Sequence, residues 1–78
     1  MFLEIITPDK KLYSGEVKSI VLPGTEGKFG LLNNHAPIIS SLKKGTLKVT
    51  DTSEAVQNFE IKGGVVEMMN NQVIILAE

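Results

Sequence analysis

The sequence predicts a single all-β domain over residues 1–78, built as an antiparallel β-sandwich or barrel. Val, Ile and Thr account for 20 of the 78 residues, and such β-branched side chains favour strands. Short apolar runs recur along the chain, each followed by turn residues. No segment keeps apolar residues at the i, i+3, i+4, i+7 spacing of an amphipathic helix for three turns.

The first predicted strand covers residues 2–7 and ends at Pro8, because proline has no N–H for a strand ladder. The second covers residues 16–23, and its side chains alternate between two faces until Gly24. The residues expected on one face are Val17, Ser19 and Val21, and those expected on the other are Lys18, Ile20 and Leu22. The third covers residues 36–42 and ends in a solvated turn at residues 43–45.

The fourth predicted strand, residues 45–51, alternates cleanly, with Leu47 and Val49 inward and Lys48 outward. The fifth covers residues 56–62 and ends at the pair Gly63-Gly64. The last two strands, residues 65–69 and 72–77, are expected to form a hairpin about Asn70-Asn71, because asparagine tolerates a positive φ angle.

Several of these strands are apolar on both faces, although the outer face of a thin sandwich is ordinarily polar. The segments concerned are Ile20-Val21-Leu22, Ile38-Ile39, Val65-Val66 and residues 73–76. Two interpretations stay open at this point. Loops or sheet edges of the same chain cover the second face, or some outward side chains contact another protein.

Composition disfavours several functions. The chain has eight lysines, no arginine and nine acidic residues, with only four aromatic residues, so a basic nucleic-acid surface is not expected. Without cysteine there is no disulfide, thiolate nucleophile or cysteine-based zinc site. No apolar run approaches the ~18 residues of a membrane span, and no signal-peptide pattern is present. These features predict a soluble intracellular domain without a cofactor.

The stretch GTEGKFGLLNNHAP, residues 24–37, is the most distinctive in the chain. A phosphate-binding loop needs a helix directly after G-K-[ST], but Lys28 is followed by Phe29 and no helical pattern follows. His35 has no nucleophile in a recognisable motif nearby. We therefore expect a structural or interface role for His35, which would hold the loop by a side-chain hydrogen bond.

A biotinyl or lipoyl carrier domain is an alternative of another class, since such domains are flat β-sandwiches with a modified lysine at a hairpin tip. The predicted tip at Asn70-Asn71 has no lysine to acylate, which disfavours this alternative. A small nucleic-acid-binding barrel is a third possibility, and it is disfavoured by the scattered lysines.

Four motifs follow one another along the chain at fixed spacing: G-T-E-G-x-F-G at residues 24–30, H-A-P at 35–37, G-G-V-V-E at 63–67 and V-x-I-L-A at 73–77. Together they closely resemble the N-terminal domain of the epsilon subunit of F-type ATP synthase, over essentially the whole chain. The resemblance implies a flattened sandwich of two five-stranded sheets. It also implies a non-catalytic rotor component of the central stalk, without cofactor or metal. Its partners would be the gamma subunit and the c-ring, at the cytoplasmic face of the bacterial plasma membrane.

Carried onto this sequence, the resemblance assigns three sets of residues. The loop facing the c-ring would hold Glu26, Gly27 and Lys28. The positions facing gamma would be Thr7, His35 and Ser40. The residues that shape the loop would be Gly24, Gly27, Gly30 and Pro37.

Three departures from the family pattern stand out. Lys28 replaces an acidic residue common in the family, and Asn33-Asn34 replaces a Pro-Gly pair before H-A-P. Asparagine also adopts the left-handed conformation, so this turn is expected to survive. The chain stops at Glu78, before the two-helix domain of most bacterial epsilon subunits. It is therefore expected to support coupling without helix-dependent inhibition of ATP hydrolysis.

Overall fold

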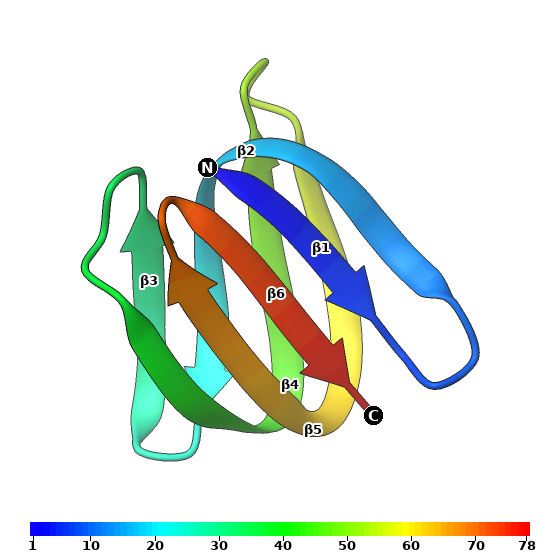
Figure 1. Cartoon of the computed structure of the whole chain (residues 1–78). Coiled ribbons are helices and arrows are strands. Elements are labelled where there is room, and N and C mark those ends of the chain that lie inside the picture. The colour runs from blue at the N-terminus through cyan, green and yellow to red at the C-terminus, as the bar shows by residue number, and fades with distance from the viewer.

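The computed structural model describes all residues 1–78 as six β-strands without any helix (Figure 1). The strands are β1 (Phe2–Ile6), β2 (Lys11–Gly24), β3 (Gly27–Leu32), β4 (Ile38–Asp51), β5 (Val56–Met69) and β6 (Gln72–Ala77). The all-β prediction is therefore confirmed.

The strands form one sheet in the order β1-β6-β5-β4-β2-β3, and β1 also pairs with β2, so the sheet closes on itself. The pairing of β1 with β6 is parallel, whereas all other pairings are antiparallel. The expected count of two five-stranded sheets differs from this arrangement. The difference arises because β2, β4 and β5 are each 14 residues long and curved, so that each strand contributes to both layers of the flattened, closed sheet (Figure 1).

The long strands bend where the sequence suggested turns. The prediction that residues 43–45 and Gly63-Gly64 end strands is wrong, because Lys43 pairs with Gly63 and Gly45 pairs with Ile61 inside one continuous ladder. Both Gly63 and Gly64 have positive φ angles, at 158° and 151°, which a glycine adopts without a Cβ clash. Glycines here allow a strand to turn a corner while its hydrogen bonds continue.

The predicted face of the second strand is also corrected. Val17, Ile20 and Leu22 are all buried, although the alternation placed Val17 opposite the other two. The register of β2 against β4 shifts between Val17 and Ser19, and such a bulge moves the following side chains to the other face. Residues 27–32 were expected to belong to a loop, but they form strand β3, which pairs with β2 across a turn at residues 25–26.

The core fills the space inside the closed sheet. Its sixteen buried residues are Met1, Leu3, Ile5, Val17, Ile20, Leu22, Leu31, Leu42, Leu47, Val49, Ile61, Val66, Met68, Val73, Ile75 and Ala77. Leu47 and Val49 point inward and Lys48 outward, as predicted. The rings of Tyr13 and Phe59 meet edge to face at a centroid distance of 5.9 Å beside this core.

Candidate docking surfaces

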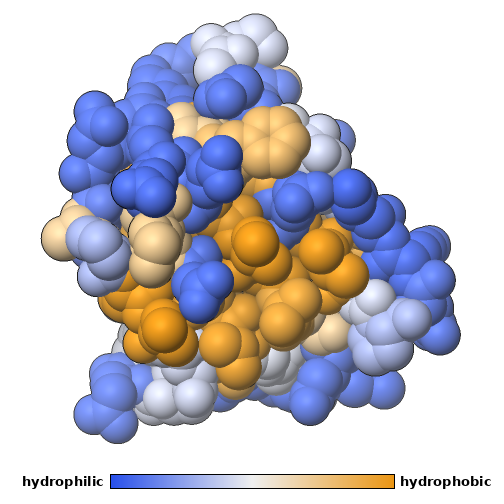
Figure 2. Space-filling view, in the orientation of Figure 1, coloured by the Kyte–Doolittle hydropathy of each residue, from blue (hydrophilic) through white to orange (hydrophobic).

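One outer face of the molecule is apolar. It is formed by β1, β6, β5 and the first half of β4, whose outward side chains lie in rows across the strands. We define the apolar face by the residues Ile6, Ile39, Val65, Met69, Ile74 and Leu76. Ile39 is 71% exposed and Leu76 is 54% exposed. Figure 2 shows apolar side chains gathered over β5 and β6, with hydrophilic groups around them. These side chains are not covered by loops or sheet edges of their own chain, which was one of the two interpretations open from the sequence.

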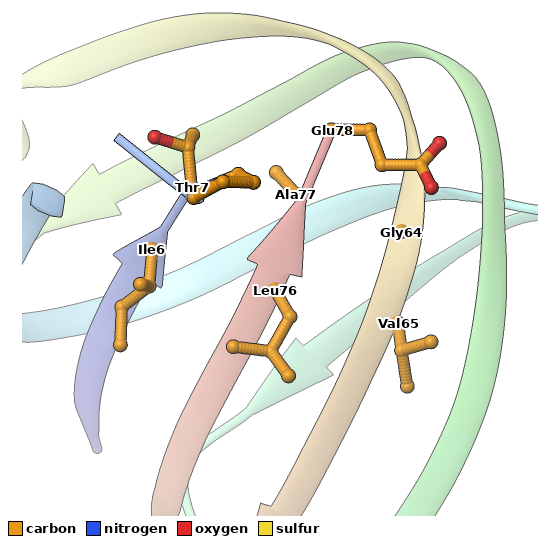
Figure 3. Close-up of a pocket in the computed structure, with 8 residues that line it drawn as sticks. Ile6, Thr7, Gly64, Val65, Leu76, Ala77 and Glu78 are labelled. Carbon is orange, nitrogen blue, oxygen red and sulfur yellow. The ribbon is translucent and has the colours of Figure 1, made fainter. Parts of the chain in front are cut away.

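The apolar face is hollowed in two adjoining places. One hollow, of about 440 Å³, lies at the ends of β1 and β6, and the other, of about 370 Å³, lies further along the strands. Both are lined by Ile6, Val65 and Leu76, which stand on three neighbouring strands (Figure 3). The first hollow also includes Thr7 and Glu78 at its rim. A partner with a protruding apolar side chain therefore has a complementary place to bind.

The three residues expected to face gamma do not lie together on this face. Thr7 lies beside the first hollow, where its hydroxyl donates to the Lys10 carbonyl at 3.0 Å and accepts from the Lys10 N–H at 3.1 Å. Ser40 pairs with buried Val66 and is half-buried, so it belongs to the inward-facing row of β4. His35 is exposed in the loop after β3. Whether these residues contact a partner stays a prediction.

The loop that carries His35 is held by local hydrogen bonds. The Nδ1 atom of His35 lies 2.8 Å from the carbonyl oxygen of Ala36, to which it donates. Asn34 has a φ angle of 64°, the left-handed conformation expected for this position. Its N–H donates to the side-chain oxygen of Asn71 at 2.7 Å, which fixes the loop to the β5–β6 hairpin. Pro37 follows at the exposed entry to β4.

The predicted β5–β6 hairpin turns at Asn70 and Asn71, with φ angles of 52° and 59°. Two successive positive φ angles are the signature of the tight two-residue hairpin turn predicted there. The tip has no lysine, the feature that a carrier domain would need.

The residues expected to face the c-ring occupy the β2–β3 hairpin. Glu26 lies in the turn of this hairpin, and Lys28 is an exposed residue near the start of β3. Gly27, between them, has a φ angle of 128°. Gly24 pairs with Gly27, and a Cβ atom on Gly24 would lie 2.7 Å from the Gly27 carbonyl oxygen. Gly24 therefore has a steric reason to be glycine. Gly30 lies within β3, where an added Cβ would meet only the Ile20 carbonyl oxygen at an ordinary 3.6 Å.

The charged groups form a few surface pairs. Glu4 and Lys11 lie 2.8 Å apart, Glu16 lies 3.4 Å from the Met1 amino group, and Lys18 pairs with Glu54. No group of His, Cys, Asp and Glu side chains has a geometry that could hold a metal ion. There is no helix in the structure with the length and hydrophobicity to cross a bilayer.

Comparison with known proteins decides the family. The sequence model of the ATP synthase delta/epsilon chain, beta-sandwich domain, matches residues 1–78. The chain belongs to this family. The resemblance seen in the sequence motifs is therefore confirmed.

Relatives in the family support the assignment. The ATP synthase epsilon chain of Leptospira borgpetersenii is 43% identical over 76 residues, which are 97% of this chain and 59% of that protein. The ATP synthase epsilon chain of Chlorobium limicola is 38% identical over 76 residues, which are 97% of this chain and 86% of that protein. The chain thus spans little more than half of the first relative and most of the second.

Solved structures show the same fold at low sequence identity. A mitochondrial ATP synthase assembly of Euglena gracilis, comprising OSCP, F1 and c-ring, contains a chain that aligns with a TM-score of 0.91 at 23% identity. The alignment covers 96% of this chain and 48% of that one. A chain of the central stalk and c-ring of Tetrahymena thermophila mitochondrial ATP synthase aligns with a TM-score of 0.83 at 20% identity, over 99% of this chain and 62% of that one.

Sequence reasoning missed one feature of the delta/epsilon-family domain in this chain, the position of Glu67. Nothing in the sequence around this acid indicates its neighbours, but the register places Glu67 between Ile39 and Ile74 in the apolar face. The available signal was a single acid within the apolar run of residues 65–69, and its meaning depends on the neighbouring strands.

Proposed function

We propose that this chain is a non-catalytic rotor subunit of the central stalk of an F-type ATP synthase. It docks on the gamma subunit and on the c-ring, and so couples proton-driven rotation of the ring to ATP synthesis elsewhere in the complex. The proposal rests on the family of the chain together with its exposed apolar face. The enzyme in this proposal is the whole complex.

The apolar face is the observation that carries the docking proposal. Monomeric proteins rarely expose a contiguous cluster of large apolar side chains without a partner. Here Ile39, Val65 and Leu76 are exposed on adjacent strands, although the same sheet buries a complete core behind them. Covering these side chains gives a favourable free energy in proportion to the apolar area removed from water. We assign the gamma subunit to this face.

The β2–β3 hairpin supplies the second contact in the proposal. Glu26 and Lys28 present opposite charges beside the tight turn that Gly24 and Gly27 allow. Charges at the rim of an interface select the partner and set its register. We assign the polar loops of the c-ring to this turn. The chain would then lie peripherally at the cytoplasmic face of a bacterial plasma membrane, through the complex.

The experiment that tests the proposal is co-migration of this chain with the gamma subunit of the same organism. Size-exclusion chromatography and native mass spectrometry are expected to show a stable one-to-one complex. A gamma subunit that is folded and yet migrates separately from the folded chain would contradict the proposal. Binding of single-stranded DNA that weakens steeply with salt would instead favour a nucleic-acid role.

A further inference from the structure

Glu67 is a carboxylate in the middle of the apolar face, whereas Glu4 stands beyond Ile74 at the β1 edge and pairs with Lys11. Across the strands Glu67 pairs with Ile39 of β4 on one side and with Ile74 of β6 on the other. Along β5, the side chains that point to the same face are those of Val65 and Met69. All four of these neighbours are exposed apolar residues. The acid is therefore surrounded by apolar side chains in both directions of the sheet.

The side chain of Glu67 has no partner within the chain, a property that it shares with Asp9, Glu26 and Glu78. Five acids have such partners: Glu4, Glu16 and Glu54 form ion pairs, and Asp51 and Glu60 accept hydrogen bonds from hydroxyl groups. Glu67 is exposed and takes part in no ion pair and no side-chain hydrogen bond within the chain. In the free chain, water solvates its carboxylate.

Docking changes the surroundings of this carboxylate. A partner that covers Ile39 and Ile74 must also cover Glu67, since it lies directly between them. A carboxylate that loses its water without gaining a partner is costly, and a matching cation with good hydrogen-bond geometry removes that cost. A purely apolar partner surface would therefore bind this face poorly.

We propose that Glu67 is a specificity-determining residue of the apolar face, which receives a lysine or arginine placed among apolar side chains of the docking partner. Arginine suits the position best, because its planar guanidinium donates two parallel hydrogen bonds to one carboxylate. The apolar neighbours supply the affinity, and the charge pair fixes one register of the partner along β5. This inference rests on the proposed docking of the gamma subunit at this face.

The test compares three forms of the chain in binding to the purified gamma subunit of the same organism. Glu67→Gln keeps the shape of the side chain and removes its charge, whereas Glu67→Leu makes the face fully apolar. Both variants are expected to bind about 10- to 100-fold more weakly than the unmodified chain in isothermal titration calorimetry. The affinity of the unmodified chain is also expected to fall more steeply with salt than that of either variant.

The matched control is Glu60→Gln, which removes an exposed acid from the other half of the same strand. It is expected to leave the affinity for gamma unchanged. Thermal unfolding of every variant checks that the fold is intact, which is expected because residue 67 is exposed.

The outcomes separate this inference from the proposed function. Binding by the unmodified chain together with equal or tighter binding by Glu67→Leu would overturn the charge pair and leave the docking face standing. Failure of the unmodified chain to bind gamma would overturn the proposed function, and this inference with it. In the expected case, charge-swap variants identify the partner residue. Single lysines and arginines of gamma are replaced by acids and tested against Glu67→Lys. Only replacement of the true partner is expected to restore the affinity that Glu67→Lys loses.

Discussion

Gly64 lies so close to β6 that a Cβ atom on this residue would be 2.2 Å from the carbonyl oxygen of Leu76. Its φ angle of 151° is also one that residues with a side chain rarely adopt. The glycine therefore serves two purposes at the corner of β5. It lets the strand bend, and it lets the backbone of β6 approach the bend.

Replacement of Gly64 by alanine is expected to destabilise the domain by about 2–4 kcal/mol, because both the contact and the φ angle become strained. Gly30→Ala is the matched control, since an added Cβ there meets only an ordinary contact. It is expected to be neutral or to stabilise the strand by about 0.5 kcal/mol. Urea unfolding of both variants measures the difference. Equal stabilities would show that the corner relaxes without cost.

Ile75 and Leu76 are neighbours on β6 with opposite environments, since Ile75 is fully buried and Leu76 is on the apolar face. Ile75→Ala is expected to cost about 2–5 kcal/mol of unfolding free energy, because it leaves a cavity in the core. Leu76→Ala is expected to cost less than about 1 kcal/mol. Chemical denaturation distinguishes them, and a large loss at Leu76 would mean that the outer side chain is part of the core.

A charge in the apolar face is expected to block docking without unfolding the chain. Leu76→Asp would place a carboxylate between the two hollows and weaken binding to gamma by roughly 2–4 kcal/mol. Val56→Asp introduces the same charge at another exposed apolar residue, outside that face, and is expected to bind normally. Calorimetric titration of gamma with each variant checks this. Similar losses in the two variants would argue against the apolar face as the docking surface.

Asp51 orders the β4–β5 hairpin. Its Oδ1 atom accepts from the backbone N–H of Ala55 at 3.0 Å, from the Ser53 hydroxyl at 2.9 Å and from the Ser53 N–H at 2.8 Å. These bonds, and above all the one from the Ala55 N–H, lower the pKa of Asp51 below its ordinary value of 3.8. Because the pKa of Asp51 is lower in the folded state than in the unfolded state, these hydrogen bonds stabilise the fold fully at pH values above 3.8. That stabilisation is lost as the pH falls through the lower pKa of the folded state.

The melting temperature of Asp51→Ala is therefore expected to lie below that of the unmodified chain at neutral pH. The gap is expected to narrow once the pH falls below 3.8. Thr52→Ala, in the same hairpin, serves as the control. Melting curves recorded between neutral and acidic pH provide the measurement, and a gap that stays constant with pH would assign the effect to the shape of the side chain alone.

Local rules account for much of the fold. The turn at Asn70-Asn71 is predictable because two residues that tolerate positive φ separate two apolar runs. The bend at Gly63-Gly64 is not, since glycine marks both a turn and a bend within a strand. Only the ladder with residues on β4 and β6 shows that β5 continues, and that ladder depends on residues far away in the sequence.

The candidate docking surface is likewise predictable partly from local sequence and partly only from the registers of the strands. Ile39, Val65 and Leu76 stand out in the sequence as apolar residues on the second face of their strands, so an apolar face was one of two predictable outcomes. The place of Glu67 depends on the registers of three strands at once, and these are fixed by the core packing behind them. No local pattern contains that information.

The parallel pairing of β1 with β6 joins the first strand of the domain to the last, across roughly 70 residues of chain. Contacts of such long range are slow to form, because the intervening chain must be ordered first. While the chain is still being synthesised, one edge of β1 and one edge of β5 have no partner until β6 leaves the ribosome. The closing step of folding therefore waits for the end of translation of this domain, and the nascent chain is open to strand pairing with its neighbours on the same messenger RNA until then.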